Sequence, residues 1–141
     1  SVPFLTAGAA SDYYLYDIAW ASNIFRSVVA DNGANPVSLV KAAGGTTSFY
    51  SASTYTGTTD IQEGTLRDVI GARGMIGLGS GNLTFSGSPI NQAVYENDRD
   101  FTRALGAGAG QVQFLSGSGV GFSAYGAPIN VNFGGAGGTV V

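Results

Sequence analysis

The sequence predicts an all-β protein of the parallel β-solenoid class, and three observations support this prediction. Glycine contributes 23 of the 141 residues, roughly twice its usual share of about 7%. Charged residues make up 11% of the chain, less than half of the usual ~25%, whereas surface helices favour long charged side chains. Short apolar or alternating segments recur at even spacing between glycine-rich turns, which is typical of all-β domains.

Residues 1–30 differ from the rest and are predicted as an aromatic-rich segment that acts as an inter-subunit strand or a cap. Aromatic side chains concentrate at 12–20, and a second apolar stretch follows at 24–29. A helix over 11–29 is possible, but β-branched and aromatic residues dominate and no capping box is evident, which favours strands. An Asn-Gly turn signal at 32–33 closes the segment, and residues 31–141 are predicted as the solenoid domain.

From Leu39 onward the chain has a regular rhythm of short strand-like segments. They lie at 39–40, 48–50, 59–61, 65–67, 83–85, 93–95, 101–103, 111–114, 121–124, 129–133 and 139–141. Within 129–133 apolar and polar residues alternate strictly, as expected of a half-buried strand.

The last segments are spaced by about ten residues, which we interpret as successive coils. Their centres are Phe101, Val112, Phe122, Val131 and Val140, with steps of 11, 10, 9 and 9 residues. We expect these five side chains to face one interior on strands about 4.8 Å apart.

A β-sandwich is the alternative fold. It needs long connections that cross between two sheets, whereas a β-helix coil needs only compact corners made by Gly, Asn, Ser and Asp. The glycine-rich spacers at 105–110, 116–119 and 134–138 suit such corners, so the solenoid is preferred.

Segment 53–66 carries a recognisable motif, with Tyr55-Thr56-Gly57 near its start and Gly64-Thr65-Leu66 at its end. It resembles the passenger-associated β-strand repeat of autotransporters and related large bacterial surface proteins. The stretches 39–46 and 101–114 resemble the segments that precede and follow that repeat. The resemblance implies a right-handed parallel β-helix on or outside a bacterial cell, and it implies no catalytic activity.

The motif also makes physical sense residue by residue. We expect Tyr55 to fill a corner of the coil, and Gly57 and Gly64 to allow turns that a Cβ atom would obstruct. Ile61 and Leu66 are expected to stack on equivalent residues of neighbouring rungs.

Composition excludes several function classes. The chain has no Cys and no His, so thiol nucleophiles, imidazole bases and the commonest zinc ligands are lacking. The net charge of −3 with scattered basic residues predicts no nucleic-acid partner. No apolar run reaches the roughly 18 to 20 residues of a membrane span. A start at Ser1 without Met is what a processed or excised chain shows, and an extracellular or cell-surface location is expected.

The densest polar run is a weak calcium candidate. Glu96, Asp98 and Asp100 offer carboxylate oxygens, which Ca²⁺ prefers. The calcium-binding nonapeptide is absent and Arg99 lies within the run, so a solvated corner loop is the better interpretation.

Acid pairs for glycoside cleavage are also conceivable but not distinguished from one another. Asp12 with Asp17, Asp60 with Glu63, or Asp98 with Asp100 could serve as acid and base. Because nothing selects among them, we predict no enzyme activity. The glycine-rich stretches lack the Gly-Lys-Ser/Thr of a phosphate loop, and no cofactor is predicted.

The aromatic cluster near the N-terminus suggests a binding surface. It could be a stacking platform for surface glycans, but contact with another subunit is favoured. The predicted subunit interface comprises Tyr13, Tyr14, Tyr16, Trp20, Phe25, Val140 and Val141.

These observations lead to a functional hypothesis. We expect a non-enzymatic structural subunit of an extracellular filament or surface layer, whose partner is another copy of itself joined head to tail through exposed strand edges. The alternatives are a fragment of an adhesin or autotransporter passenger and, third, a polysaccharide-processing enzyme. Deleting residues 1–30 should then leave soluble, non-fibrous material.

Overall fold

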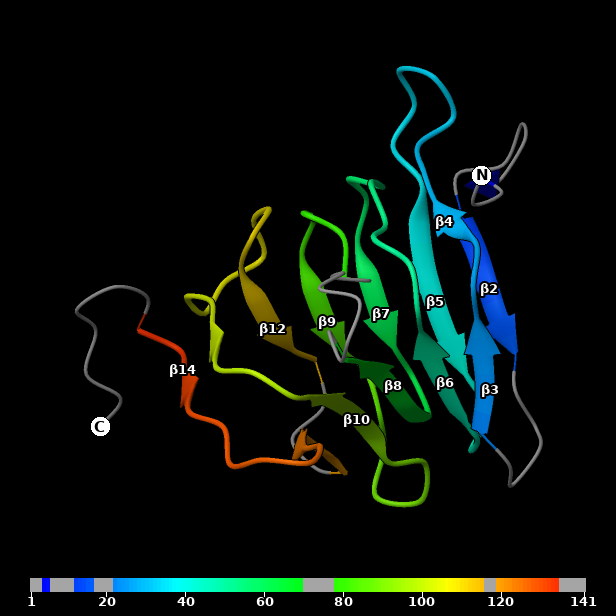
Figure 1. Ribbon diagram of the computed structural model, residues 1–141. Coiled ribbons are helices and arrows are strands. Elements are labelled where there is room, and N and C mark those ends of the chain that lie inside the picture. Colours follow the sequence, from blue (N-terminus) through cyan, green and yellow to red (C-terminus); the bar gives the residue numbers. More distant parts are fainter. Residues whose placement is uncertain (1–3, 6–11, 17–21, 70–77, 116–118, 135–141) are drawn as a thin grey trace.

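The computed structural model describes residues 4–5, 12–16, 22–69, 78–115 and 119–134. They form a parallel β-solenoid of about 4 turns without a helix, and the strands of successive coils lie side by side (Figure 1). Every pairing between its named strands is parallel. This confirms the predicted solenoid, and the β-sandwich alternative is wrong.

Two five-stranded sheets form two sides of each coil. The first sheet contains, in spatial order, β2 (Asp12–Tyr16), β5 (Ser38–Ala42), β7 (Thr59–Ile61), β9 (Leu83–Phe85) and β12 (Val112–Phe114). The second contains β3 (Ser22–Phe25), β6 (Thr46–Phe49), β8 (Gly64–Asp68), β10 (Ala93–Asn97) and β13 (Val120–Ala124).

The third side is less regular. It carries two short pairs, β1 (Phe4–Leu5) with β4 (Val28–Val29) and β11 (Phe101–Thr102) with β14 (Val131–Asn132). Between these pairs, backbone hydrogen bonds outside the named strands join the described parts of the coils, such as Tyr55 N to Val29 O at 3.2 Å and Ser80 N to Tyr55 O at 3.3 Å.

The spacing of about ten residues corresponds to one side of a coil rather than to one coil. Phe101, Val112 and Phe122 lie on β11, β12 and β13, and the chain returns to pair Val131 with Phe101. The prediction that these residues mark successive coils is therefore wrong, although all four do belong to one interior cluster. Val140 lies outside the described residues.

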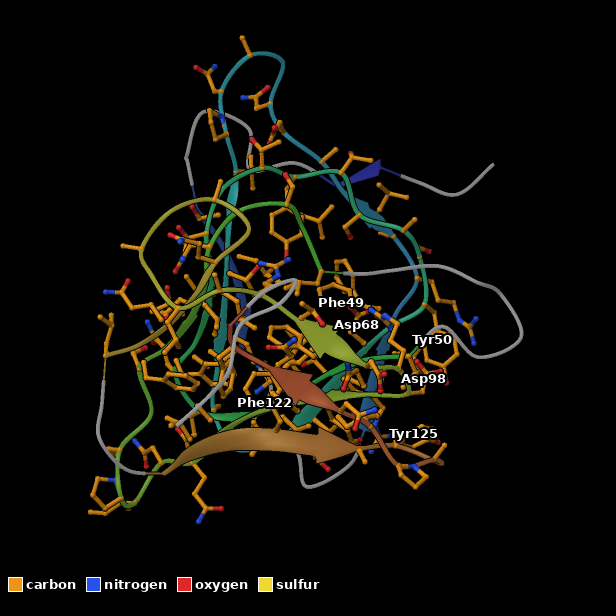
Figure 2. All side chains as sticks on the ribbon, turned by 90° about the vertical axis from the view of Figure 1, so that its left-hand side faces the viewer. Phe49, Tyr50, Asp68, Asp98, Phe122 and Tyr125 are labelled. Atoms are coloured by element: carbon orange, nitrogen blue, oxygen red, sulfur yellow. The ribbon has the colours of Figure 1, made fainter. Side chains whose placement is uncertain are left out.

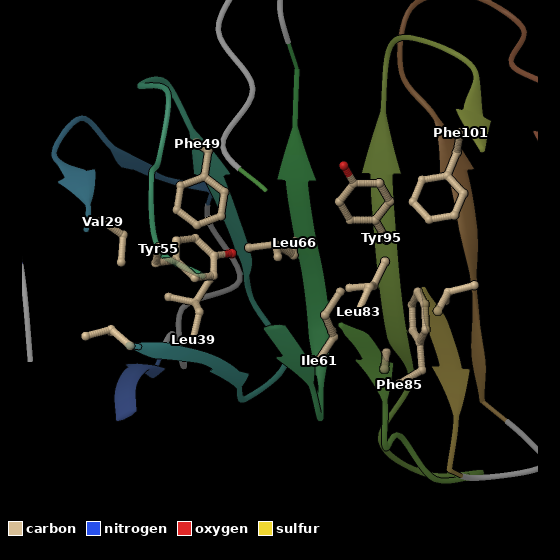
Figure 3. Packing of buried hydrophobic residues seen from close by; sticks show 13 residues of the cluster. Val29, Leu39, Phe49, Tyr55, Ile61, Leu66, Leu83, Phe85, Tyr95 and Phe101 are labelled. Carbon is tan, nitrogen blue, oxygen red and sulfur yellow. The ribbon is translucent and has the colours of Figure 1, made fainter. Parts of the chain in front are cut away.

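Inward-facing residues of both sheets and of the third side form one apolar column (Figure 3). Burial alternates along the strands, as at β10, where Ala93, Tyr95 and Asn97 face inward. The ring of Phe101 lies 5.6 Å from that of Tyr95 and 4.7 Å from that of Phe122, measured between centroids. Each fully buried large apolar side chain contributes about 1.5–3 kcal/mol, so this column is the main source of stability.

The motif at 53–66 supplies several parts of this column. Tyr55 is fully buried, and its hydroxyl hydrogen-bonds Thr59 Oγ1 at 2.6 Å. Ile61 and Leu66 are also fully buried; Ile61 pairs with Phe85 and Leu66 with Tyr95 of the next coil. These positions match the expected packing of the motif.

Buried tyrosines make the fold sensitive to alkali. Burial raises the pKa of Tyr55 to about 12 and that of Tyr95 well above its ordinary value of 10.0. A raised folded-state pKa means that stability is intact below the unfolded-state pKa near 10 and is lost as the pH rises through the folded-state pKa. We expect the free energy of unfolding to fall between pH 10 and pH 12, with Tyr55 contributing about 3 kcal/mol. Urea unfolding at pH 8 and pH 11 measures this. The variant Tyr55→Phe should show a shallower decline, and an equal decline in both proteins would contradict the assignment.

Candidate functional site

At the two ends of the solenoid lie strands whose outer edges no described strand covers. Each sheet begins with a strand paired on one side only, β2 in the first and β3 in the second, and ends with β12 and β13. Within the described residues no named strand pairs with the outer edges of these four strands. Val112 of β12 exchanges backbone hydrogen bonds with Ala104 and Gly106, which cover the start of that one edge. A free edge presents unpaired N–H and C=O groups and is a template for another strand.

Aromatic side chains lie at the end formed by β12, β13 and β14. The ring of Phe114 stacks on that of Phe85 at 5.2 Å and meets the ring of Phe133 edge-on at 5.5 Å. Phe122 lies inside this end of the coil (Figure 2). Phe114 is 36% exposed and Leu115 is 62% exposed, so the apolar interior extends to the surface here.

The strands β12, β13 and β14 carry no charged residue of their own, and one carboxylate of the preceding coil, that of Asp100, holds β14. None of residues 104–141 is charged, although edge strands are commonly blunted by charged side chains. Asp100 accepts hydrogen bonds from Asn130 N at 2.8 Å and from Asn130 Nδ2 at 3.1 Å, and these bonds hold the pKa of Asp100 below its ordinary value. The hydrogen bonds between Asp100 and Asn130 attach the residue before β14 to the preceding coil.

The opposite end contains part of the predicted interface. Tyr13, Tyr14 and Tyr16 lie on β2, which pairs with β5 of the same chain. The ring of Phe25 on β3 packs edge-on against Phe49 of the next coil at 6.0 Å. The inner edges of these strands are therefore paired in cis, and their outer edges form the end of the sheets. Trp20, Val140 and Val141 lie outside the described residues.

The structure does not bring the calcium candidates together. Glu96 pairs with Arg67 at 2.5 Å, Asp98 with Arg99 at 3.3 Å, and Asp100 binds Asn130. No group of three or more acidic residues in the described part of the chain is arranged to hold a metal ion.

The proposed acid pairs are likewise dispersed or engaged. Asp60 accepts hydrogen bonds from Gln62 Nε2 at 2.9 Å and from Ser86 Oγ at 2.6 Å. Asp12 lies on the end strand β2, and Asp17 is outside the described residues. The carboxylate of Glu63 lies beside Gly44 at a corner between the two sheets.

A buried polar cluster around Asp68 was not predicted from the sequence. Asp68 is fully buried and accepts hydrogen bonds from Tyr95 Oη and Arg99 Nη2, both at 2.7 Å. Burial lowers the pKa of Arg99, but Asp68 and Tyr95 outweigh it and keep that pKa above its ordinary value. Arg103 donates to the carbonyls of Gly81 at 2.7 Å and Gly79 at 3.0 Å. These arginines bridge each coil to the preceding one, Arg99 through Asp68 and Arg103 through Gly79 and Gly81.

Lys41 is a second buried charge. Its side chain is fully buried, and Nζ donates to the carbonyl oxygens of Ala43 at 2.6 Å, Ala42 at 3.0 Å and Glu63 at 3.0 Å. The ammonium joins the corner that follows β5 to the corresponding corner of the next coil. The sequence did not predict this role, since Lys41 is one of the scattered basic residues and belongs to the stretch 39–46 that resembles the segment before the repeat.

The fold and its free edges define the chain as a parallel β-solenoid. The sequence matches no protein-family model, no curated protein and no solved structure. In the described part of the chain no helix is sufficiently long and apolar to cross a bilayer.

Proposed function

We propose that the chain is a non-enzymatic structural subunit of an extracellular filament or surface layer, and that copies stack end to end. The free edges at both ends of the sheets carry this proposal. The strands of one end run parallel to those of the other, so a second copy placed on the end continues both sheets in the same sense. Such head-to-tail contact is heterologous and yields an open filament unless the rotation closes a ring.

The chemistry of the β12–β14 end supports this mode of assembly. Phe114 and Leu115 present exposed apolar surface beside the free edges, and an added coil would bury it. The lack of charge throughout 104–141 removes the usual obstacle to edge pairing.

The second candidate is a segment of an autotransporter passenger or adhesin. The placement of the 53–66 motif favours it, because its tyrosine, its glycines and its leucine all occupy positions that a β-helix requires. In that case the same edges continue into further coils of one longer chain. Electron microscopy separates the two candidates, since long regular fibres favour the subunit and isolated short rods favour the passenger.

The assembly proposal predicts the effect of a charge at the free edge. Leu115→Lys introduces a cation beside β12, where a neighbouring copy would have to desolvate it. The variant is expected to remain folded, because this side chain is 62% exposed, but to form no fibres under conditions where the unsubstituted chain does. Negative-stain microscopy and sedimentation velocity measure both properties.

A matched control is available on the lateral surface. Ile90 is 91% exposed on the loop before β10, so Ile90→Lys makes the same kind of change away from both ends and should leave fibres intact. A monomeric unsubstituted chain at high concentration, or fibres from Leu115→Lys, would refute end-to-end stacking. Deleting 1–30 is a less selective test, because loss of β2 and β3 would create a new edge at β5 and β6.

A further inference from the structure

A groove runs along the outer face of the second sheet, away from both ends. One stretch of about 470 Å³ is lined by outward-facing residues of β8, β10 and β13, among them Thr65, Glu96 and Ser123. A second stretch of about 310 Å³ continues it to Gly44 and Glu63. Both stretches share Thr65, Gln92 and Val94, so together they cross several coils.

Two glycines in this groove are not required by the fold. Gly121 and Gly44 do not have a left-handed φ, and a Cβ atom at Gly121 would meet nothing within 4 Å. At Gly44 the nearest atom would be Glu63 Oε1, at an ordinary 3.5 Å. Glycine inside a strand costs roughly 0.5–1 kcal/mol relative to alanine, so Gly121 on β13 weakens the sheet without local compensation. Both glycines line the open space of the groove.

The polar groups of the groove are available to a ligand. The side chains of Thr65, Gln92 and Glu63 have no hydrogen-bond partner in the described part of the chain. Together they offer a hydroxyl, an amide and a carboxylate, which can both donate to and accept from neighbouring groups. Val94 on the floor and Ile90 on the rim add apolar surface. A ligand that matches this lining needs hydroxyl groups for the polar side chains and an apolar face for the valine and isoleucine. Sugar rings have both.

The charge of the groove restricts the ligand further. Its carboxylates are Glu63 and Glu96, and neither stretch is lined by a lysine or arginine of the described chain. Two cations lie close to the groove. Arg67 is paired with Glu96 at 2.5 Å and lies 4.4 Å from the ring centroid of Tyr125, which is at one corner of the coil (Figure 2). The buried Lys41 Nζ donates to the backbone carbonyl of Glu63 at 3.0 Å. An anionic polymer would meet the carboxylate of Glu63, which has no ion-pair partner in the described part of the chain, and would be repelled by it. An extended peptide would find the backbone groups of β8 and β10 already paired within the sheet.

From this lining we infer that the groove over β8, β10 and β13 binds a neutral oligosaccharide chain. Glu63, Thr65 and Gln92 hydrogen-bond its hydroxyls, Val94 supports a ring face, and Gly121 leaves the space in which the chain lies. Arg67 keeps the Glu96 carboxylate in place at the far end of the groove. This site is separate from the strand edges and does not depend on the proposed filament.

The test uses Gly121→Leu, with chitopentaose and cellopentaose as neutral probes and an oligogalacturonate as the anionic probe. Isothermal titration calorimetry measures binding, and thermal unfolding monitors the fold. The unsubstituted chain should bind at least one neutral probe more tightly than the anionic one. Gly121→Leu should lose at least tenfold in affinity with an unchanged or higher Tm, because its side chain enters open space.

Two further variants keep the result interpretable. Gln113→Leu adds the same side chain on β12 of the first sheet and should bind normally. Gln92→Ala, in the exposed loop before β10, should also weaken binding of the neutral probe. If Gly121→Leu fails to fold, the affinity of Gln92→Ala tests the inference in its place. The inference is overturned if neither neutral probe binds, if the anionic probe binds better, or if Gly121→Leu binds undiminished. A change in sedimentation of Gly121→Leu without any glycan binding would instead assign the groove to a second copy of the chain.

Discussion

Gly64→Ala is expected to lower the free energy of unfolding by more than about 4 kcal/mol, a loss that marks a specific structural conflict. Gly64 has φ of +77°, a conformation that costs an L-residue roughly 1–2 kcal/mol. An added Cβ would also collide with the carbonyl oxygens of Ala43 and Gly45 and would lie 2.7 Å from Lys41 Nζ. Two of these atoms are backbone of the adjoining coil and cannot move aside without opening the corner. Urea unfolding followed by circular dichroism measures the loss.

Gly33→Ala is the matched control for this substitution. Gly33 has φ of +62° in the exposed Asn-Gly turn, and a Cβ there would meet nothing within 4 Å. Only the backbone cost of about 1–2 kcal/mol should appear. The difference between the two variants therefore isolates the contact between coils. Equal losses would show that the close approach at Gly64 does not contribute.

Lys41→Met is the second substitution with a large expected effect, a loss of about 3–5 kcal/mol. Methionine has a similar length but no donors, so the carbonyl groups of Ala42, Ala43 and Glu63 each lose the ammonium hydrogen bond that they accept in a buried corner. Leaving buried acceptors without donors carries the full desolvation cost of each group. The loss should appear in chemical unfolding at neutral pH.

Arg26→Met provides the comparison for a cation at the surface. Arg26 is exposed, and its guanidinium carbon lies 5.4 Å from the ring centroid of Tyr50. An exposed contact of this kind is worth roughly 0.5–1 kcal/mol, so this variant should lose little stability. If Lys41→Met were as mild as Arg26→Met, the ammonium would not be needed to hold the corner.

The apolar segments of the sequence located the strands well. Val112, Phe122 and Val131 were each expected at the centre of a strand, and each lies in one. Alternation along a strand is a local property that depends on which side chains face the interior, so the sequence alone reveals it. The roles of the glycines and the tyrosine in the 53–66 motif could also be predicted from the sequence, because they depend on local steric requirements.

The number of strands in a coil was decided by the tertiary structure. A spacing of about ten residues fits one coil or one side of a three-sided coil equally well, since both place the same residues inward. Phe101 pairs with Val131 rather than with Val112, which shows that about ten residues form one side of a coil. Which strands become neighbours depends on how sharply each corner turns, and that geometry is not encoded in the apolar rhythm.

Polar residues show the same division between sequence and structure. Composition by itself determined that the chain lacks thiols and imidazoles and that 104–141 carry no charge. The burial of Lys41 and Asp68, and the space above Gly121, emerged only in the folded coil stack. Residues of one coil meet partners far away in the sequence, as Lys41 meets Glu63 at a separation of 22 residues and Asp68 meets Arg99 at a separation of 31. The physical reason is that these hydrogen bonds and ion pairs form between neighbouring coils of the solenoid. A polar side chain therefore has its partners only after the neighbouring coil has folded against it.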